Sequence, residues 1–300
     1  MRVLVTGATG FVGRHFLRHA AAEYPNWTIF ASGHQTPSRT VEAAEFLQAN
    51  LLFPDQALGL LHDARPDAIV HLAGLTGGSP EALWQANVTG TWNLLGSIVR
   101  TPRENPLRIV LASSAAVYGS AGVNQLPITE STGLQPTSPY ALSKAAQELA
   151  CQAASLEPGC ELIRARLFNL MGPGQPDHLV PAAFIRQLQE DRTGNKLKVG
   201  DLTATRDFVD VRDAVRALAF LLRLGLSGAA YNIAGGHERT IQEVLEALIR
   251  VAGWNISIEV DETRIHGGGV TRSWASIDAL SNLGWSAQVP FEQSLKDMLG

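Results

Sequence analysis

The chain has 300 residues, of which 45% are hydrophobic and 17% charged, and its formal net charge is −4. This composition predicts one large or two small globular units with a substantial core. The acidic balance and the lack of any Lys/Arg run argue against nucleic acid as a partner. No stretch reaches the roughly 18 apolar residues of a membrane helix, and no cationic-then-apolar leader is visible, so we expect a cytoplasmic protein without membrane contact.

The first half of the chain alternates short apolar runs with longer amphipathic runs. We expect strands at 2–7, 27–33, 45–52, 67–74, 108–114 and 160–172, and helices at 11–24, 55–65, 81–100 and 138–156. Strand–helix alternation with strands rich in Val, Ile and Leu predicts a parallel sheet covered on both faces. The expected fold class is therefore α/β, with a doubly wound, Rossmann-type sheet.

The second half of the chain has a less regular pattern of apolar and polar residues. A segment rich in Gly and Pro (169–180) precedes an expected helix (181–190), a strand leading into a helix (206–225) and a strand (228–236), and the rest is irregular. We expect a dinucleotide-binding domain from 1–168 with 207–232. A smaller C-terminal substrate-binding lobe would comprise 169–206 with 233–300.

Neither cysteines nor histidines suggest a metal or a disulfide. Cys151 and Cys160 predict two reduced thiols rather than a disulfide framework. His15 and His19 have helical spacing, but no carboxylate or cysteine cluster accompanies them, so we expect no metal site.

A glycine triplet follows the first expected strand. Gly7 allows a tight turn, Gly10 lets a pyrophosphate approach the backbone, and Gly13 lets the helix pack closely on the strand. The helix N-terminus adds free N–H groups and a positive dipole. A strand before and a helix after the triplet predict dinucleotide binding.

The end of the second strand bears on the choice of dinucleotide. An acid at this position would hold the ribose 2′-OH of NAD, but the segment "IFASGHQTPSR" contains neither Asp nor Glu. Ser32, His34 and Arg39 are present instead, and small or basic groups suit a 2′-phosphate. We therefore expect NADP (as NADPH), with NAD as the alternative.

Tyr140 and Lys144 are four residues apart at the start of an expected helix, and so lie on one helical face. A free tyrosine has a pKa near about 10, and a neighbouring ammonium favours its phenolate. A shift of about 3 units corresponds to roughly 4 kcal/mol. This pair predicts a proton donor or acceptor, Tyr140, tuned by a lysine.

Two serines, Ser113 and Ser114, end the fifth strand. Ligands of parallel sheets bind at the carboxyl ends of strands. We expect the Ser114 hydroxyl to bond a substrate carbonyl or alkoxide oxygen while Tyr140 exchanges the proton. The alternative is that the serines satisfy local backbone groups.

These motifs, with "HLAG", "NVTGTWNLL", "SSAAVYG", "SPYALSK", "RARLFNLMGPGQ", "RDFVDVRDAV" and "YNIAGG", resemble the extended short-chain dehydrogenase/reductase family over nearly the whole chain. The resemblance implies an NAD(P)-dependent oxidoreductase acting on a nucleoside-diphosphate sugar. The later segments are most similar to reductases of GDP-4-keto-6-deoxy-D-mannose, which implies NADPH-dependent reduction of a 4-keto-6-deoxy sugar. It also implies a homodimer formed through the helices at 81–100 and 139–156.

The same resemblance implies further contacts. The cofactor-binding residues, besides those named above, would be Thr9, Phe11, Val12, Asn50, Leu51, Leu72, Ala73, Gly74, Asn87 and Leu167, together with Tyr140 and Lys144. The substrate-binding residues would be Thr76, Ser114, Asn169, Val180, Arg206 and Arg264.

Arg206 would meet the diphosphate through its paired donors. Its alternative role is an ion pair with Asp207 or Asp210. Arg264 or Arg272 would make the second phosphate contact.

Related activities remain as alternatives. Dehydratases of this family carry a general acid or base after the serine pair, where this chain has Ala115 and Ala116. A methyl group cannot move a proton, so we do not expect a dehydratase. Reduction and 4-epimerisation both need only hydride transfer plus Ser, Tyr and Lys, and "SSAAVYG" is locally epimerase-like. An NAD-dependent 4-epimerase is the main alternative, and a non-catalytic dinucleotide sensor the minor one.

Overall fold

The computed structural model describes residues 1–36, 44–101, 103–120, 123–154, 159–190, 196–261, 263 and 270–300. The chain forms two compact units. The first comprises Met1–Gly119, Gly133–Leu167 and Val215–Tyr231, and the second Ser120–Thr132, Phe168–Ala214 and Asn232–Gly300. Residues 120–132 and 207–214, which we expected in the dinucleotide-binding domain, group with the second unit.

A seven-stranded sheet organises the first unit, with strand order β10-β6-β5-β4-β1-β2-β3. Its strands are β1 (Arg2–Thr6), β2 (Thr28–Gly33), β3 (Ala44–Gln48), β4 (Ala68–His71), β5 (Leu107–Ser114), β6 (Cys160–Leu167) and β10 (Ala230–Ile233). The pairings from β3 across to β6 are all parallel. Because helices cover both faces, the central strands are buried and apolar except at their ends, as the α/β doubly wound prediction requires, and that prediction is confirmed.

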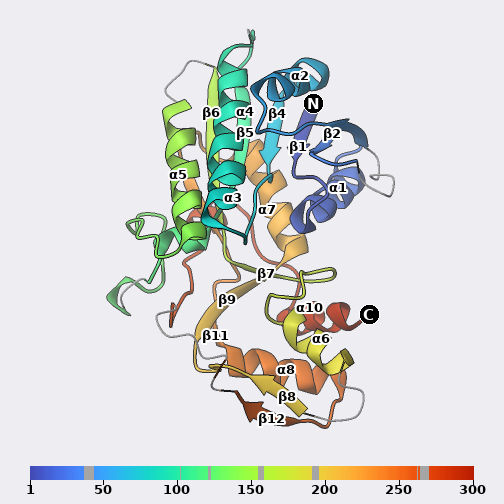
Figure 1. Ribbon diagram of the computed structural model, residues 1–300, viewed down its shortest axis with the longest axis vertical. Helices are drawn as coiled ribbons and strands as arrows, with labels where there is room; N and C mark the ends of the chain where they lie inside the picture. Colours follow the sequence, from blue (N-terminus) through green and yellow to red (C-terminus); the bar gives the residue numbers. More distant parts are fainter. Residues whose placement is uncertain are drawn as a thin grey trace. The chain divides into compact units, whose positions relative to one another are not determined.

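Three helices cover one face of this sheet: α2 (Pro54–Ala64), α4 (Gly90–Val99) and α5 (Pro139–Ala154). They bury Leu60, Leu94 and Cys151 in one cluster with strand residues such as Ile109. Figure 1 shows α4 and α5 running side by side. A right-handed β1–α1–β2 crossover places α1 (Phe11–Glu23) on the opposite face.

The expected helix over 81–100 is interrupted. It consists of α3 (Pro80–Trp84), a π-helical turn η1 (Gln85–Thr89) and then α4. Ser79 caps α3 by accepting a 3.2 Å hydrogen bond from the backbone N–H of Ala82. The π-helical turn buries Asn87 completely, and such turns are frequent at functional sites.

The second unit contains two small sheets. One has the order β11-β9-β7, from β7 (Asn169–Met171), β9 (Thr205–Asp210) and β11 (Glu238–Thr240), and the other pairs β8 (Lys196–Val199) with β12 (Ser257–Val260). The strand expected over 160–172 is therefore two strands, since β6 and β7 belong to different sheets. Because β9 pairs with β7 and β11, residues 207–210 belong to this unit.

The C-terminal part is more regular than we expected. Helices α8 (Ile241–Ala252) and α10 (Phe291–Leu299) pack on a cluster that includes Phe208, Leu248 and Leu295, with α6 (Ala182–Glu190) and the short α9 (Asp278–Ser281) completing the unit. A capping box begins α8, with Thr240 accepting from the Glu243 N–H at 3.0 Å. Its T-x-x-E pattern was the sequence signal for this helix.

Helix α7 (Val211–Leu224) begins in the second unit and continues in the first. In the first unit, its Arg223 guanidinium lies 5.6 Å from the centre of the Tyr24 ring, just after α1. Two 3-10 turns, η2 (Ala115–Tyr118) and η3 (Val123–Gln125), follow β5. Among the described residues, no helix has the length and apolar character needed to cross a membrane.

Candidate active site

Ser114, Tyr140 and Lys144 come together at the carboxyl end of β5. Tyr140 and Lys144 occupy the first turns of α5, whose start is capped by Ser138 through a 3.1 Å bond from the Ala141 N–H. A side-chain hydrogen bond joins Tyr140 to Ser114, the last residue of β5. The sequence spacing therefore produced the expected cluster of hydroxyl, phenol and ammonium.

The acidity of Tyr140 differs from our expectation. Burial raises the pKa of the phenol above its ordinary value, and the hydrogen bond with Ser114 opposes this only in part. The Lys144 ammonium does not reverse the effect, because two of its donors are directed to other acceptors: the Ala112 carbonyl and the Gln147 amide oxygen, each 2.8 Å from Nζ. Tyr140 is thus protonated around neutral pH, which suits a proton donor.

Lys144 is itself almost fully buried. Desolvation lowers the pKa of its ammonium to about 8, while the nearby Glu148 and Cys151 act to raise it. At neutral pH the side chain therefore keeps its charge, close to its titration point.

Ser114 also has a structural role. Its Oγ accepts a 3.2 Å bond from the Ala116 N–H and so caps η2, as our alternative for the serines anticipated. The two roles are compatible, because a hydroxyl can accept from the backbone and still donate to a second group. Ala115 and Ala116 present only methyl groups in this turn.

A buried ion pair that we did not predict from the sequence lies next to Ser113. The Glu148 carboxylate accepts from Ser113 Oγ at 2.5 Å and from Arg166 Nε and Nη2 at 3.0 and 2.8 Å. Arg166 also donates to the Tyr118 hydroxyl at 2.9 Å. The spacing of Tyr140, Lys144 and Glu148, each four residues after the previous one, was the signal that could have identified it.

The glycine loop has the geometry of a phosphate cradle. A Cβ on Gly7, whose φ is +66°, would lie 2.6 Å from the Ala73 nitrogen, and one on Gly13 would lie 2.4 Å from the Gly7 oxygen. Gly10 is exposed and caps α1 without a side-chain hydrogen bond. With no acid in the first turn, the N–H groups of Phe11 and Val12 face an anion-binding position. These residues fit a dinucleotide pyrophosphate.

The end of β2 carries no acid between Ser32 and Thr36. Ser32 is buried and His34 exposed, and Gln48 from β3 holds this loop by donating to the His34 carbonyl at 3.1 Å. Thr9 packs beneath it, with its Oγ1 3.4 Å from where a Cβ of Gly33 would lie. Arg39 lies outside the described residues.

The turn after β4 approaches the lysine closely. A Cβ on Gly74 would lie 2.5 Å from Asn87 Oδ1 and 3.7 Å from Lys144 Nζ. The Asn87 amide accepts from the Leu75 N–H at 2.8 Å and donates to the Leu75 carbonyl at 3.0 Å and to Ser143 Oγ at 2.9 Å. Asn87 therefore shapes this turn with its own polar atoms.

The remaining expected cofactor contacts lie just after β3 or at the end of β6, two other strands of the sheet. Asn50 Oδ1 accepts from the Leu52 N–H at 3.0 Å, and the Leu51 carbonyl accepts from Asn93 at 2.9 Å. Leu167 ends β6 beside Ser114.

The expected substrate residues are divided between the units. Thr76 and Ser114 belong to the first unit, and Asn169, Val180 and Arg206 to the second, while Arg264 lies outside the described residues.

Arg206 has no carboxylate partner among the described residues. It donates from Nη1 to the Thr205 carbonyl at 2.7 Å, whereas Asp210 binds Arg212 at 2.8 Å. Asp207 accepts instead from backbone N–H groups, including those of Gly235 at 2.7 Å and Ala275 at 3.2 Å. The ion-pair alternative for Arg206 is therefore wrong here, and the guanidinium retains donors for a ligand.

Arg272, the other candidate for a second phosphate contact, is already paired. It holds Glu238 through two bonds of 2.7 Å.

A parallel sheet with an uncapped glycine loop at one strand end, and a Ser–Tyr–Lys cluster at another, defines an oxidoreductase that uses a dinucleotide. Residues 3–234 match the NAD dependent epimerase/dehydratase family, and the chain belongs to this family. The resemblance to extended short-chain dehydrogenases/reductases is thereby confirmed.

Individual relatives cover the whole chain. GDP-6-deoxy-D-mannose reductase of Pseudomonas aeruginosa is 36% identical, over 99% of this chain and 96% of its own. The structure of RMD from Pseudomonas aeruginosa complexed with NADPH has a TM-score of 0.86 at 33% identity, covering 100% of this chain and 98% of the other. UDP-glucose 4-epimerase from Thermus thermophilus in complex with NAD also has a TM-score of 0.86, at 26% identity, covering 100% and 98%.

Proposed function

We propose that this chain uses NADPH to reduce the C4 ketone of a 4-keto-6-deoxyhexose linked to GDP. The observation that carries the proposal is the buried, protonated Tyr140 bonded to Ser114, on a chain 36% identical to a GDP-6-deoxy-D-mannose reductase. A reductase must donate a proton to the oxygen that gains charge, and a phenol with a raised pKa holds that proton until it is needed.

The residues of the site divide the chemistry between them. NADPH, when bound, supplies the hydride that reduces the ketone carbon. Ser114 donates a hydrogen bond to the ketone oxygen and so stabilises the charge that develops there. Tyr140 transfers its phenolic proton to the same oxygen, forming the alcohol.

Lys144 acts on the phenolate that this transfer leaves. Its ammonium lies on the same helical face and has one N–H beyond the two that bond Ala112 and Gln147. That donor holds the nicotinamide ribose, while the charge of the ammonium stabilises the phenolate. Regeneration of the phenol then takes a proton from solvent.

The choice of NADPH rests on the end of β2. No carboxylate stands between Ser32 and Thr36 to repel a 2′-phosphate or to hold a 2′-hydroxyl. The relative RMD carries NADPH in its structure, which supports the same choice. Ser32, His34 and Arg39 are the proposed neighbours of that phosphate, and NAD is the alternative cofactor.

The substrate diphosphate is assigned to Arg206, whose guanidinium has free donors and no carboxylate partner among the described residues. We propose that Thr76, Asn169, Val180 and Arg264 line the rest of the sugar-nucleotide site.

The test is to incubate the protein with NADPH and GDP-4-keto-6-deoxymannose. We expect substrate-dependent NADPH oxidation and formation of a GDP-6-deoxyhexose, with both lost in Tyr140→Phe. No NADPH oxidation in the native chain, or the same rate in Tyr140→Phe, contradicts the proposal.

A second candidate is an NAD-dependent 4-epimerase. The methyl groups of Ala115 and Ala116 beside Ser114 suit it equally well, and UDP-glucose 4-epimerases are among the relatives. An epimerase retains NAD through each cycle, whereas a reductase consumes NADPH. Mass spectrometry of the purified protein distinguishes them, because tightly co-purified NAD favours the epimerase.

We also propose that the chain forms a homodimer through α4 and α5. Both helices present large apolar side chains to solvent, with Trp92, Val99, Leu142 and Leu149 each more than half exposed. Such apolar residues on adjacent helices are typical of a protein interface.

A further inference from the structure

We propose that Gln147 is a positioning residue for Lys144: its amide holds the ammonium in place and joins it, through Thr91 and His71, to Thr6 at the start of the glycine loop. The inference concerns the proposed Ser–Tyr–Lys site and so rests on the proposed function. It depends on a run of buried hydrogen bonds within the first unit.

The amide orientation of Gln147 is determined by its neighbours. Lys144 has only donors, so the amide atom 2.8 Å from Nζ must be the oxygen. The amide nitrogen then faces Thr91 Oγ1, also at 2.8 Å. Gln147 and Thr91 are fully buried, so neither bond competes with water.

The directions of the remaining bonds follow in turn. Thr91 donates its only hydroxyl proton to the Asn87 carbonyl at 2.7 Å, so it can only accept from His71 Nε2 at 2.8 Å. His71 Nε2 therefore carries the ring proton, and Nδ1 accepts from Thr6 Oγ1 at 2.7 Å. Thr6 in turn accepts from the Ala73 N–H at 3.3 Å.

Each hydrogen bond in this series has a single possible direction, and the series ends at backbone groups, the Ala112 carbonyl beside Lys144 and the Ala73 N–H beside Thr6. Burial, reinforced by the charge of Lys144, lowers the pKa of His71 to about 3, so the ring is neutral. The amide of Gln147 separates the ammonium from that ring, since its oxygen accepts and a different atom donates. The arrangement fixes the position of the ammonium and does not conduct its proton.

The groups around Lys144 decide what a change at Gln147 does. From α5, Glu148 and Cys151 favour the ammonium; from β4, His71 is neutral; from β5, only the Ala112 carbonyl contacts Nζ. Gln147 adds a neutral acceptor to a buried cation without adding a charge. Removing that acceptor disfavours the ammonium, and replacing it with a carboxylate favours it.

Three variants test the effect of Gln147 on Lys144. Two change Gln147 itself, Gln147→Leu and the isosteric Gln147→Glu. The third, Gln152→Leu, is the matched control and changes an exposed glutamine of the same helix. The readout is the titration of Lys144 in the free protein, followed by NMR of the ¹³Cε resonance of ¹³C-labelled lysine, which reports a buried amine without a reagent. We expect Gln147→Leu to lower the pKa of Lys144 by about one unit and Gln147→Glu to raise it by at least as much. Gln152→Leu leaves it unchanged.

A second pair of variants tests the next bond. Thr91→Val removes the acceptor of the Gln147 amide and is expected to shift the Lys144 titration in the direction of Gln147→Leu, by a smaller amount. Thr91→Ser keeps the hydroxyl and leaves the titration unchanged. The alkaline limb of the pH–rate profile follows the same order, with KM for the keto sugar moving less than kcat.

The inference is overturned if Gln147→Leu and Gln147→Glu leave Lys144 titrating as in the native protein, or shift it in the same direction. Should Gln147→Leu not fold, the volume-conserving Gln147→Glu decides alone. A native protein that does not turn over the keto sugar refutes the proposed function, while the titration of Lys144 still decides the role of Gln147.

Discussion

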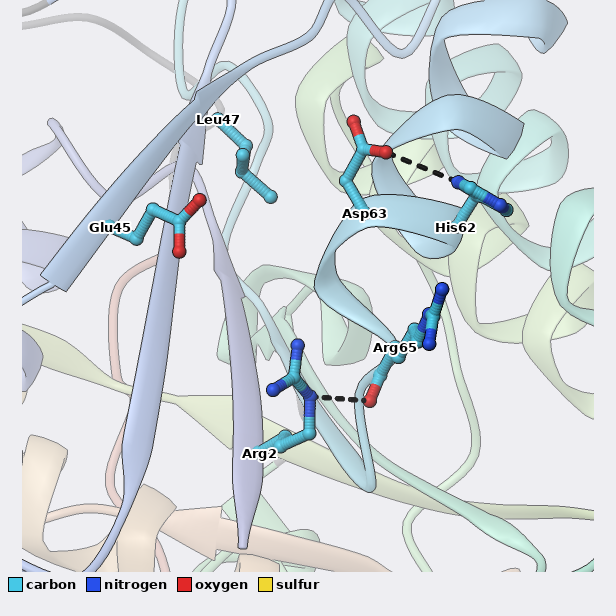
Figure 2. Close-up of a pocket in the computed structure, with 6 residues that line it drawn as sticks. All are labelled: Arg2, Glu45, Leu47, His62, Asp63 and Arg65. Atoms are coloured by element: carbon cyan, nitrogen blue, oxygen red, sulfur yellow. Dashed lines mark hydrogen bonds and ion pairs between the residues drawn. The ribbon is translucent and has the colours of Figure 1, made fainter.

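The two ends of the seven-stranded sheet are both rich in polar residues, yet they differ in how those residues are held. At the carboxyl ends, Thr6, His71 and Ser113 are buried and hydrogen-bonded to other buried side chains. At the amino ends, a hollow of about 640 Å³ is lined by Arg2, Glu45, Leu47, His62, Asp63 and Arg65 (Figure 2).

The hollow at the amino ends has little chemical organisation. Its contact between His62 and Asp63, at 3.2 Å, joins side chains that are 77% and 63% exposed, and Arg2 Nε donates to the Ala64 and Arg65 carbonyls. Exposed charges are screened by water and salt and their side chains are mobile, so they contribute little to the binding of a ligand. A concave surface does not make a site here, whereas fixed buried dipoles on the opposite edge do.

The largest expected effect is at the phenol. Tyr140→Phe should lower kcat for NADPH-dependent ketone reduction by about 10²–10⁴-fold, because the phenyl ring has no proton to transfer to the ketone oxygen beside Ser114. Steady-state kinetics checks this. Tyr24→Phe, at a tyrosine stacked on Trp27 with ring centres 4.0 Å apart, is the control and should retain native kcat.

The next effect concerns the buried ion pair next to Ser113. Glu148→Gln leaves Arg166 buried without its counter-charge, and should lower the free energy of unfolding by about 3–5 kcal/mol. Glu161→Gln breaks the ion pair with Arg108, in which the Glu161 side chain is 39% exposed and the Arg108 side chain 23%. This variant should lower the free energy of unfolding by less than about 1 kcal/mol. Urea denaturation of both variants measures the contrast, and equal losses would contradict it.

A pH effect follows from His71. Its pKa is about 3 in the folded protein against 6.5 for an ordinary histidine, so between these values the unfolded state binds more protons. Stability from this group is complete above pH 6.5 and falls as the pH falls toward 3, by up to about 1.4 kcal/mol per pH unit. Urea midpoints of the native chain and His71→Gln should show a shallower acid slope in the variant. Parallel slopes would show that His71 is not the group responsible.

The smallest effect is expected at the amino ends of the strands. His62→Ala and Asp63→Asn should each change the free energy of unfolding by less than about 0.5 kcal/mol and leave kcat unchanged. A loss of activity in either variant would mean that the hollow in Figure 2 is a functional site after all.

Much of the first unit could be predicted because its signals are local. Glycines after a strand, and Tyr140 four residues before Lys144, each specify a geometry within a single turn or helix. The partners of Lys144 could not be predicted in this way, since Thr91 and Ala112 come from elements distant in sequence. The raised pKa of Tyr140 was missed for a related reason: burial depends on packing, and spacing alone shows only which charges are near.

The second unit was predicted less well. Its strands are three to six residues long, so the alternation of β8 (KLKV) extends over only four residues, and β7 continues the apolar run of β6 after one residue. Only the pairing of β7 with β9 separates the two strands. The capping box of α8 was a local signal and could have been used.

The π-helical turn at Gln85–Thr89 has a consequence for sequence change in this region. Such a turn holds one residue more than an α-helical turn, so deleting one residue there would close it into an ordinary α-helical turn and leave α4 in phase with α3. Thr91, Leu94 and Ile98 would keep their buried positions, whereas Asn87 would lose the place from which it bonds Leu75 and Ser143. A deletion in the regular part of α4 would instead rotate the residues after it by about 100° and turn them away from the sheet. One residue can therefore be lost between Trp84 and Gly90 without unpacking α4, at the expense of the turn beside Lys144.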